Sequence, residues 1–344
     1  ASGAPHGQIL IGGASPQTAA TGMPIQGAAG GPFSTLAPAG GTSAPMALTT
    51  AYLGDVALAA PPAAAGHAPG ALRVHVERFY AHQFAPATVA GGGGAGPLQA
   101  LTLAMDYRSE ALVVWAQDGA VYARLLPAGG AARPIQRLGL AGTRPAITAV
   151  LSDDRRGIVA WAAQRGEQTS VYIDRSAVDV RFGAPELLER FRDPDGLRSP
   201  AASPTLVRLS SESVMLAWAG AATGHWVVHT APVDLDGVGQ VGTIAAPGTD
   251  ALLAGLAAGP LDDALVLWTE PLAGSGAPSM TLQTLYAAQG FNLYPPARTV
   301  FGVSEQIAPP GSVRDAAVAF DPDDDRAIAA WQGQTGAIEY SIRK

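Results

Sequence analysis

The chain has 344 residues, of which 48% are hydrophobic and 14% charged, and it carries a formal net charge of −7. This length and apolar content suffice for a large core, while the acidic balance disfavours a nucleic-acid backbone as a partner. The sequence has no cysteine, which excludes disulfides and thiol sites, and it has no run of about 20 apolar residues that would span a membrane.

The first 13 residues contain one short apolar run, residues 8–11, that could form a strand. The chain starts on Ala1 without an initiator Met, which is typical of a mature terminus left by signal-peptide removal. A shortened chain is the other explanation. The first explanation predicts a secreted protein or one of the periplasm or cell envelope.

Residues 14–44 form an uncharged segment rich in Gly, Pro, Ala and Thr, and no Asp, Glu, Lys or Arg precedes Asp55. Such a segment can cover an apolar surface without burying a charge. It either packs on its own domain or lies against another subunit. The second interpretation predicts a protein partner or self-assembly, with four apolar side chains as the partner-binding candidates: Met23, Ile25, Phe33 and Leu36.

From residue 45 onward a local pattern repeats, in which a short apolar run ends in tryptophan. Five copies close on Trp115, Trp161, Trp218, Trp268 and Trp331, at spacings of 46, 57, 50 and 63 residues, and a sixth, earlier copy has Ala60 at the tryptophan position. A unit of roughly 40 to 50 residues made of short strands is the signature of a β-propeller blade. The pattern predicts a single domain, 1–344, with blades near 45–96, 97–144, 145–199, 200–248, 249–312 and 313–344.

The clearest unit is parsed into four strands, over residues 145–151, 157–161, 170–175 and 182–188. The second strand is apolar throughout because an inner strand is covered on both faces, whereas the third alternates. The last unit stops after its third strand. We therefore expect an all-β fold, a six-bladed propeller of four-stranded blades, whose ring is closed by an amino-terminal strand (1–13) that completes the last blade.

Acidic residues concentrate in the turns between the first and second strands of the units, which share one rim of the propeller. Ordinary solvated turns explain this, and the alternative is a ring of one sign that steers a basic partner. In the last of these turns, Asp321, Asp323 and Asp325 have the spacing of calcium-loop carboxylates. Arg326 and Gln332 replace the Gly and Glu that such a loop requires, so a polar turn is favoured over a Ca²⁺ site.

The opposite rim collects the residues that follow each tryptophan. Their hydrogen-bonding groups suit sugar hydroxyls or a protein surface better than acid–base catalysis, and the only obvious carboxylate pair, Asp118 and Glu270, lies three blades apart. No catalytic residue or cofactor is assigned. The ligand-binding candidates are Gln117, Asp118, Gln164, Arg165, His225, Glu270 and Gln332.

The unit of residues 319–331, an Asp-rich turn leading into an apolar run that ends in Trp331, resembles the repeats of secreted bacterial β-propellers. This resemblance covers most of residues 45–344 and implies a fold rather than an activity. The favoured hypothesis is a non-enzymatic structural or protein-binding subunit. The alternative is a carbohydrate-binding or carbohydrate-active propeller that uses the rim after the tryptophans.

Overall fold

The computed structural model describes strands and their connections over most of the chain from residue 47 onward. Within it, every regular element is a strand, and all pairings between the named strands are antiparallel. None of the described residues forms a helix that could cross a membrane. The described ranges are 47–50, 55–60, 72–77, 88–91, 96–194, 203–209, 213–222, 224–234, 237–244, 250–259, 261–271, 283–293, 298–309, 313, 316–320, 326–333 and 335–343.

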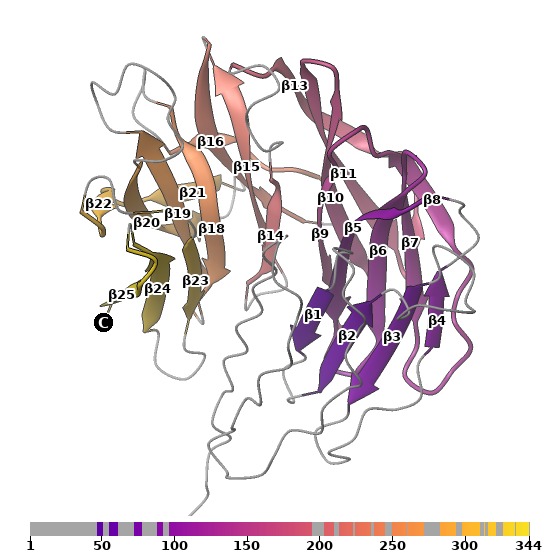
Figure 1. Ribbon diagram of the computed structural model, residues 1–344. Helices are drawn as coiled ribbons and strands as arrows, with labels where there is room; N and C mark the ends of the chain where they lie inside the picture. Colours follow the sequence, from indigo (N-terminus) through magenta and orange to yellow (C-terminus); the bar gives the residue numbers. More distant parts are fainter. Residues whose placement is uncertain are drawn as a thin grey trace, which may run out of the picture.

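Consecutive strands pair to give six described sheets, numbered in chain order (Figure 1). Antiparallel neighbours need only short connections, so each sheet is a local product of its own stretch of sequence. The first three sheets are sheet 1, with β1 (Ala47–Thr50), β2 (Val56–Ala60), β3 (Leu72–Glu77) and β4 (Thr88–Gly91); sheet 2, with β5 (Leu98–Met105), β6 (Ala111–Gln117), β7 (Ala120–Leu126) and β8 (Gln136–Leu140); and sheet 3, with β9 (Ala146–Leu151), β10 (Gly157–Arg165), β11 (Gln168–Ala177), β12 (Arg181–Phe182) and β13 (Glu186–Arg192).

The remaining sheets repeat this order of strands. In sheet 5 two short outer strands pair with the same third strand, as they do in sheet 3. These sheets are sheet 4, with β14 (Thr205–Arg208), β15 (Val214–Ala222), β16 (His225–Val233) and β17 (Gly242–Thr243); sheet 5, with β18 (Leu252–Ala258), β19 (Asp263–Pro271), β20 (Gln283–Leu293), β21 (Arg298–Phe301) and β22 (Glu305–Gln306); and sheet 6, with β23 (Ala316–Phe320), β24 (Ala327–Gln332) and β25 (Ile338–Arg343).

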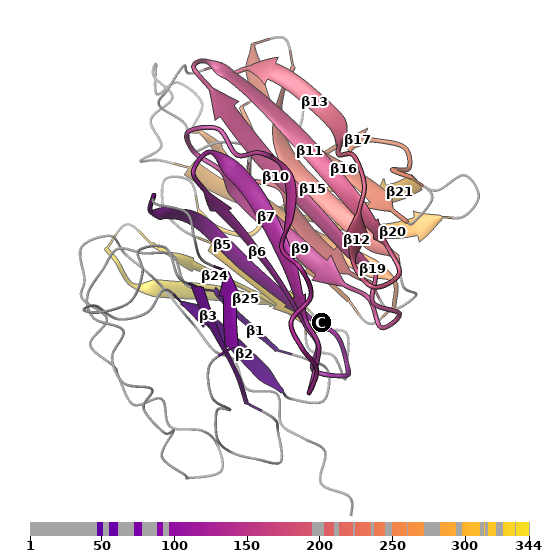
Figure 2. The same ribbon diagram turned by 90° about the vertical axis from the view of Figure 1, so that its right-hand side faces the viewer.

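The sheets stack face to face in chain order, and each first strand packs against the first strand of the next sheet. In Figure 2, β7, β10 and β16 of successive sheets lie at a similar tilt. Five apolar clusters fill the spaces between consecutive sheets, one for each interface from sheets 1 and 2 to sheets 5 and 6. This is the architecture of a β-propeller, in which a sheet buries its faces only by stacking on its neighbours.

The second strands show why the tryptophan copies are so regular. All seven residues of β6 are buried, as are the first eight of β10, because each of these strands is covered on both faces. The five repeat tryptophans are no more than 5% exposed, and each packs in the cluster shared with the preceding sheet. The expectation that they are buried between adjacent sheets is confirmed.

The fourth strand of sheet 3 differs from the expected residues 182–188. Strand β12 ends at Phe182, and β13 begins only at Glu186. Pro185 lies between them and has no N–H to donate to β11, so the pairing is interrupted and resumes beyond it.

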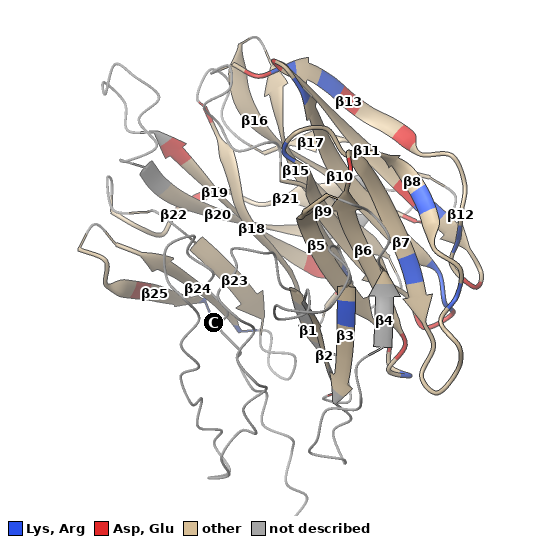
Figure 3. Cartoon of the chain, turned by 45° about the vertical axis from the view of Figure 1, so that its right-hand side comes forward, with Lys and Arg blue, Asp and Glu red and all other residues tan. Residues whose placement is uncertain are grey.

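The outer strands are the edges of the sheets, and several carry charged side chains (Figure 3). Arg137 lies on β8 and Arg190 on β13, where charge discourages pairing with foreign strands. The edge strand of sheet 6 is different. On β25, Ile338, Tyr340 and Ile342 share one face and are 70%, 66% and 52% exposed.

The all-β prediction is confirmed, and the described strands show an open stack rather than a closed ring. No comparable contact joins the described strands of sheets 1 and 6, and sheet 6 has three described strands. The expected closing strand, residues 1–13, lies outside the described residues.

Candidate functional site

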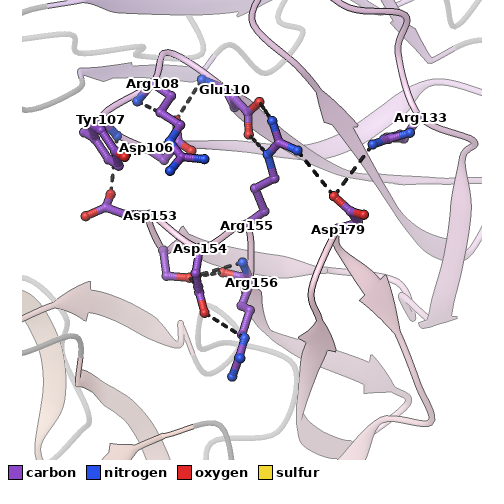
Figure 4. Close-up of polar contacts among 11 residues, drawn as sticks. Asp106, Tyr107, Arg108, Glu110, Arg133, Asp153, Asp154, Arg155, Arg156 and Asp179 are labelled. Atoms are coloured by element: carbon purple, nitrogen blue, oxygen red, sulfur yellow. Dashed lines mark hydrogen bonds and ion pairs between the residues drawn. The ribbon is translucent and has the colours of Figure 1, made fainter.

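The rim formed by the turns between first and second strands carries a network of charged side chains (Figure 4). Arg155, from the turn after β9, donates two hydrogen bonds of 2.6 Å to the carboxylate of Glu110, from the turn after β5. Arg155 and Arg133 also lie 3.5 and 3.6 Å from Asp179. These contacts join sheets 2 and 3.

A second pair joins sheets 3 and 4 on the same rim. Arg208 of β14 donates hydrogen bonds of 2.7 and 2.5 Å to the carboxylate of Asp153. Hydrogen bonding to this guanidinium lowers the pKa of Asp153 below its ordinary value. Asp106 is buried, and its burial raises its pKa even though it accepts hydrogen bonds from the backbone of Arg108 and Glu110.

These contacts change the interpretation of the acidic turns. The alternative interpretation, a ring of like charge, took each turn by itself, whereas in sheets 2 to 4 Glu110, Asp153, Asp154 and Asp179 face arginines. The reason is spatial: the arginines that pair with Glu110 and Asp153 come from the next sheet, so the sign of each turn does not show the charge of the assembled rim. This part of the rim is a set of ties between sheets.

On the opposite rim, Gln117 and Asp118 belong to the hairpin between β6 and β7. Gln117 is buried and donates a hydrogen bond of 2.8 Å to the carbonyl oxygen of Gly96 in the preceding connection. Asp118 and Gly119 have φ values of 51° and 73°, as a two-residue hairpin turn requires. In these positions Gln117 holds a connection and Asp118 forms a turn.

Gln164 has a similar position at the end of β10. It is fully buried and donates a hydrogen bond of 2.7 Å to Asp193, which also accepts one of 2.7 Å from Thr169. This buried group fixes the connection that leaves sheet 3. Arg165, the next candidate along the chain, is the exposed last residue of β10, directly before the hairpin turn.

The other three candidates lie on sheets 4, 5 and 6. His225 is 3.5 Å from Asp250, Glu270 accepts a hydrogen bond of 2.9 Å from the indole of Trp268, and Gln332 donates one of 3.3 Å to the carbonyl of Gly336. The seven candidates thus occupy five sheets, and these contacts lead to nearby residues of the strands and their connections. Their role as ligand-binding residues stays a prediction.

Two further sets of candidates cannot be placed. Met23, Ile25, Phe33 and Leu36, and the acidic turn with Asp321, Asp323 and Asp325, lie outside the described residues. Among the residues that the structure does describe, no group of three or more His, Asp or Glu is arranged to hold a metal ion.

The structure adds a hollow that the sequence did not suggest, on the outer wall between β17 and β21. Its volume is about 550 Å³, within the range of ligand pockets. Among the described residues that line it, none has a charged or amide side chain, and Val300 and Val303 at its border are 47% and 94% exposed. The lining residues are Gly242, Thr243, Ile244, Ala288, Thr299, Val300, Phe301, Gly302, Val303 and Ser304.

Beside this hollow lies a polar group that sequence reasoning also missed. His229 of β16 lies between Thr243 of β17 and Glu189 of β13. The sequence signal that could have identified His229 was its separation from the repeat tryptophan. His229 follows Trp218 by 11 residues, as Tyr172 follows Trp161. Hairpins of unequal length in the other copies hide this correspondence.

Comparison with known proteins supports the fold and no activity. Neither a protein-family model nor a curated protein matches the sequence. Hydrazine synthase from Kuenenia stuttgartiensis is similar in structure, with a TM-score of 0.50 and 11% identity over 83% of this chain and 73% of that chain. The Aleuria aurantia lectin, described as a six-bladed β-propeller that recognises fucose, gives a TM-score of 0.42 and 12% identity over 87% of this chain and 93% of that chain. At such identities the likeness concerns the fold alone.

Proposed function

We propose that this protein is a non-enzymatic β-propeller of the cell envelope or extracellular space, which serves as a structural or protein-binding subunit of a larger assembly. The hollow between β17 and β21 is the observation that supports this most. Its exposed valines, and the lack of charged or amide side chains among its described lining residues, suit the apolar side chain of a protein partner. Sugar hydroxyls and reacting groups need directed polar partners, which this lining supplies only as hydroxyls and backbone.

The fold part of the proposal is a closed ring of six four-stranded blades. Sheet 6, with three described strands and an apolar row on β25, supports it. A strand from residues 8–11 would supply the fourth position at the edge of β25. The face that bears Ile338, Tyr340 and Ile342 would then meet sheet 1 on closure.

The test of partner binding places a charge in the hollow. Val303→Glu should abolish the association of the protein with its assembly. Light scattering of native extracts and of the purified complex measures this, and the high-mass species should be lost. Leu261→Glu is the matched control, because Leu261 is 66% exposed and lies in the turn before β19, away from the hollow. Equal behaviour of the two variants would contradict the proposal.

The carbohydrate alternative has its own test on the opposite rim. Binding on a glycan array, or turnover of a glycan, that disappears in Glu270→Ala and Asp118→Ala would favour it over the proposed subunit. Fractionation of the native host tests the location, since a cytoplasmic protein would contradict the envelope or extracellular assignment.

A further inference from the structure

One interface between sheets departs from the repeat at two positions that meet in space. In sheets 2, 3 and 5 the residue paired with the tryptophan is a tyrosine whose ring stacks on it, at centroid distances of 5.4 to 5.8 Å. In sheet 4 this position is His229, paired with Trp218 and 5.3 Å from its ring. An ionisable imidazole therefore replaces a phenol ring at the interface between sheets 3 and 4.

The second departure lies on the facing strand of the preceding sheet. The outer strands of sheets 1 to 3 each have a register shift, and in the first two the residue directly after it faces the next sheet: Gly91 in β4 and Gly139 in β8. A Cβ on either glycine would lie 2.7 or 2.8 Å from the indole of the next tryptophan, so the repeat requires glycine there. In β13 the corresponding residue is Glu189.

The two departures form one group. Glu189 accepts a hydrogen bond of 2.6 Å from the indole N–H of Trp218, and its other oxygen lies 3.7 Å from Nε2 of His229. The Nδ1 atom of His229 is 3.1 Å from the hydroxyl of Thr243. Gly220 makes the room, because a Cβ there would lie 2.3 Å from the Glu189 carboxylate and 2.6 Å from the imidazole ring.

The polar atoms of this group are compatible with both protonation states of the imidazole. The neutral ring donates from Nε2 toward Glu189 and accepts from the Thr243 hydroxyl. The protonated ring donates from both nitrogens, toward a carboxylate and a hydroxyl oxygen that can each accept. It then also forms an ion pair across the interface, where the two side chains are only 16% and 20% exposed.

The elements packed on β16 add few other charges. Strand β15 contributes the Trp218 ring and Gly220, and β17 contributes Thr243. Strand β18 has no titratable side chain, and β21 has one, Arg298, whose side chain lies outside the described part of the structure. Glu189 from β13 is the charged group in contact with His229.

We propose that Glu189, His229 and Thr243 form a proton-operated clamp, in which protonation of His229 tightens the contact between sheets 3 and 4 in mildly acidic conditions. Imidazole is the side chain whose charge ordinarily changes between about pH 5 and 8. Because Thr243 also lines the hollow between β17 and β21, proton uptake acts directly behind that surface.

The carboxylate keeps its charge over this pH window. Burial opposes ionisation of Glu189, but the neighbouring imidazole of His229 and the hydrogen bond from Trp218 outweigh it and lower the pKa of Glu189 below its ordinary value. The stabilisation by the ionised carboxylate is therefore present above the unfolded-state pKa and is lost only as the pH falls through the lower folded-state pKa. The contact between sheets 3 and 4 is therefore tightest at pH values above the folded-state pKa of Glu189 and below the pH at which the imidazole loses its proton.

Amide hydrogen exchange of the full chain at pH 5.5 and pH 8.0, corrected for intrinsic rates, tests the clamp. The background is Asp174→Asn, because Asp174 of β11 also titrates in this range. Protection of β13 and β15 should be about tenfold higher at the acidic pH, while that of β5 and β6 should not change.

Two variants locate the effect in the proposed group. Glu189→Gln keeps an acceptor for Trp218 but removes the charge, and it should abolish the pH dependence; the double variant Glu189→Gly with His229→Tyr, which restores the repeat, should do the same. His225→Gln, on the same strand, should retain it. A pH dependence that survives in Glu189→Gln, or its absence in the parent chain, would overturn the proposal.

Discussion

At the residue scale, the core tryptophan in each of sheets 2 to 4 is fixed by a ring on its own sheet and by an outer strand of the preceding sheet. Trp161 stacks on Tyr172 and lies against Gly139, while its indole N–H donates a hydrogen bond of 3.1 Å to the carbonyl of Leu140. The sequence predicts that the tryptophan is buried. It does not predict the glycine, since Gly139 is one of 42 glycines and its importance comes from the neighbouring sheet.

Gly139→Ala should destabilise the protein through overpacking. The new Cβ would lie 2.8 Å from the Trp161 ring, a contact that forces rearrangement and costs about 1–3 kcal/mol. Chemical denaturation measures the change. Gly183→Ala is the control, because nothing lies within 4 Å of its Cβ position, and a similar loss of stability in both variants would contradict this packing.

Asp174 offers a pH-dependent prediction. Its burial raises its pKa to about 6, although backbone N–H groups of Gly183 and Arg175 favour the charged form. A raised pKa in the folded state means that the protein loses stability as the pH rises from about 4 to 6.

Asp174→Asn should therefore stabilise the protein at pH 7.5, by on the order of 1–3 kcal/mol, and have little effect at pH 4. Urea unfolding at the two pH values measures this. The same change in stability at both would show that ionisation of Asp174 has no part in it.

At the element scale, the strands that contain the repeat tryptophans follow from the sequence because an apolar run between polar turns identifies a strand covered on both faces. Strand β10 was expected over residues 157–161; it begins at Gly157 as expected and continues past the tryptophan to Arg165. The outer strands were harder to predict from the sequence, since Pro185 divides one of them and their register shifts leave no sequence pattern. The contacts between turns, such as Arg155 with Glu110, depend on how neighbouring sheets stack, which no single unit encodes.

Arg155→Ala tests the ties between sheets 2 and 3. Glu110 is only 4% exposed, so the loss of both hydrogen bonds from Arg155 leaves a buried carboxylate without its charge partner. The thermal midpoint should fall clearly. Arg192→Ala is the control: Arg192 and Glu167 are 78% and 54% exposed, and their pairing should contribute little. Equal midpoints for both variants would mean that the tie between sheets is unimportant.

At the scale of the whole molecule, the repeat predicts stacked sheets, and five interface cores are present. The ring is the part that local patterns do not determine, because closure joins the two ends of the chain. Local patterns do not determine the functional site either. The candidate residues after the tryptophans were chosen for their chemistry, whereas the hollow between β17 and β21 arises where two outer strands come together.

The most direct test of the closed six-bladed ring is the thermal unfolding midpoint after deletion of residues 1–12. If residues 8–11 complete sheet 6, this deletion exposes the edge of β25, and the midpoint should fall or the protein should aggregate. Deletion of residues 1–6, which keeps residues 8–11, should leave the midpoint unchanged. An unchanged midpoint after the longer deletion would contradict closure by the amino terminus.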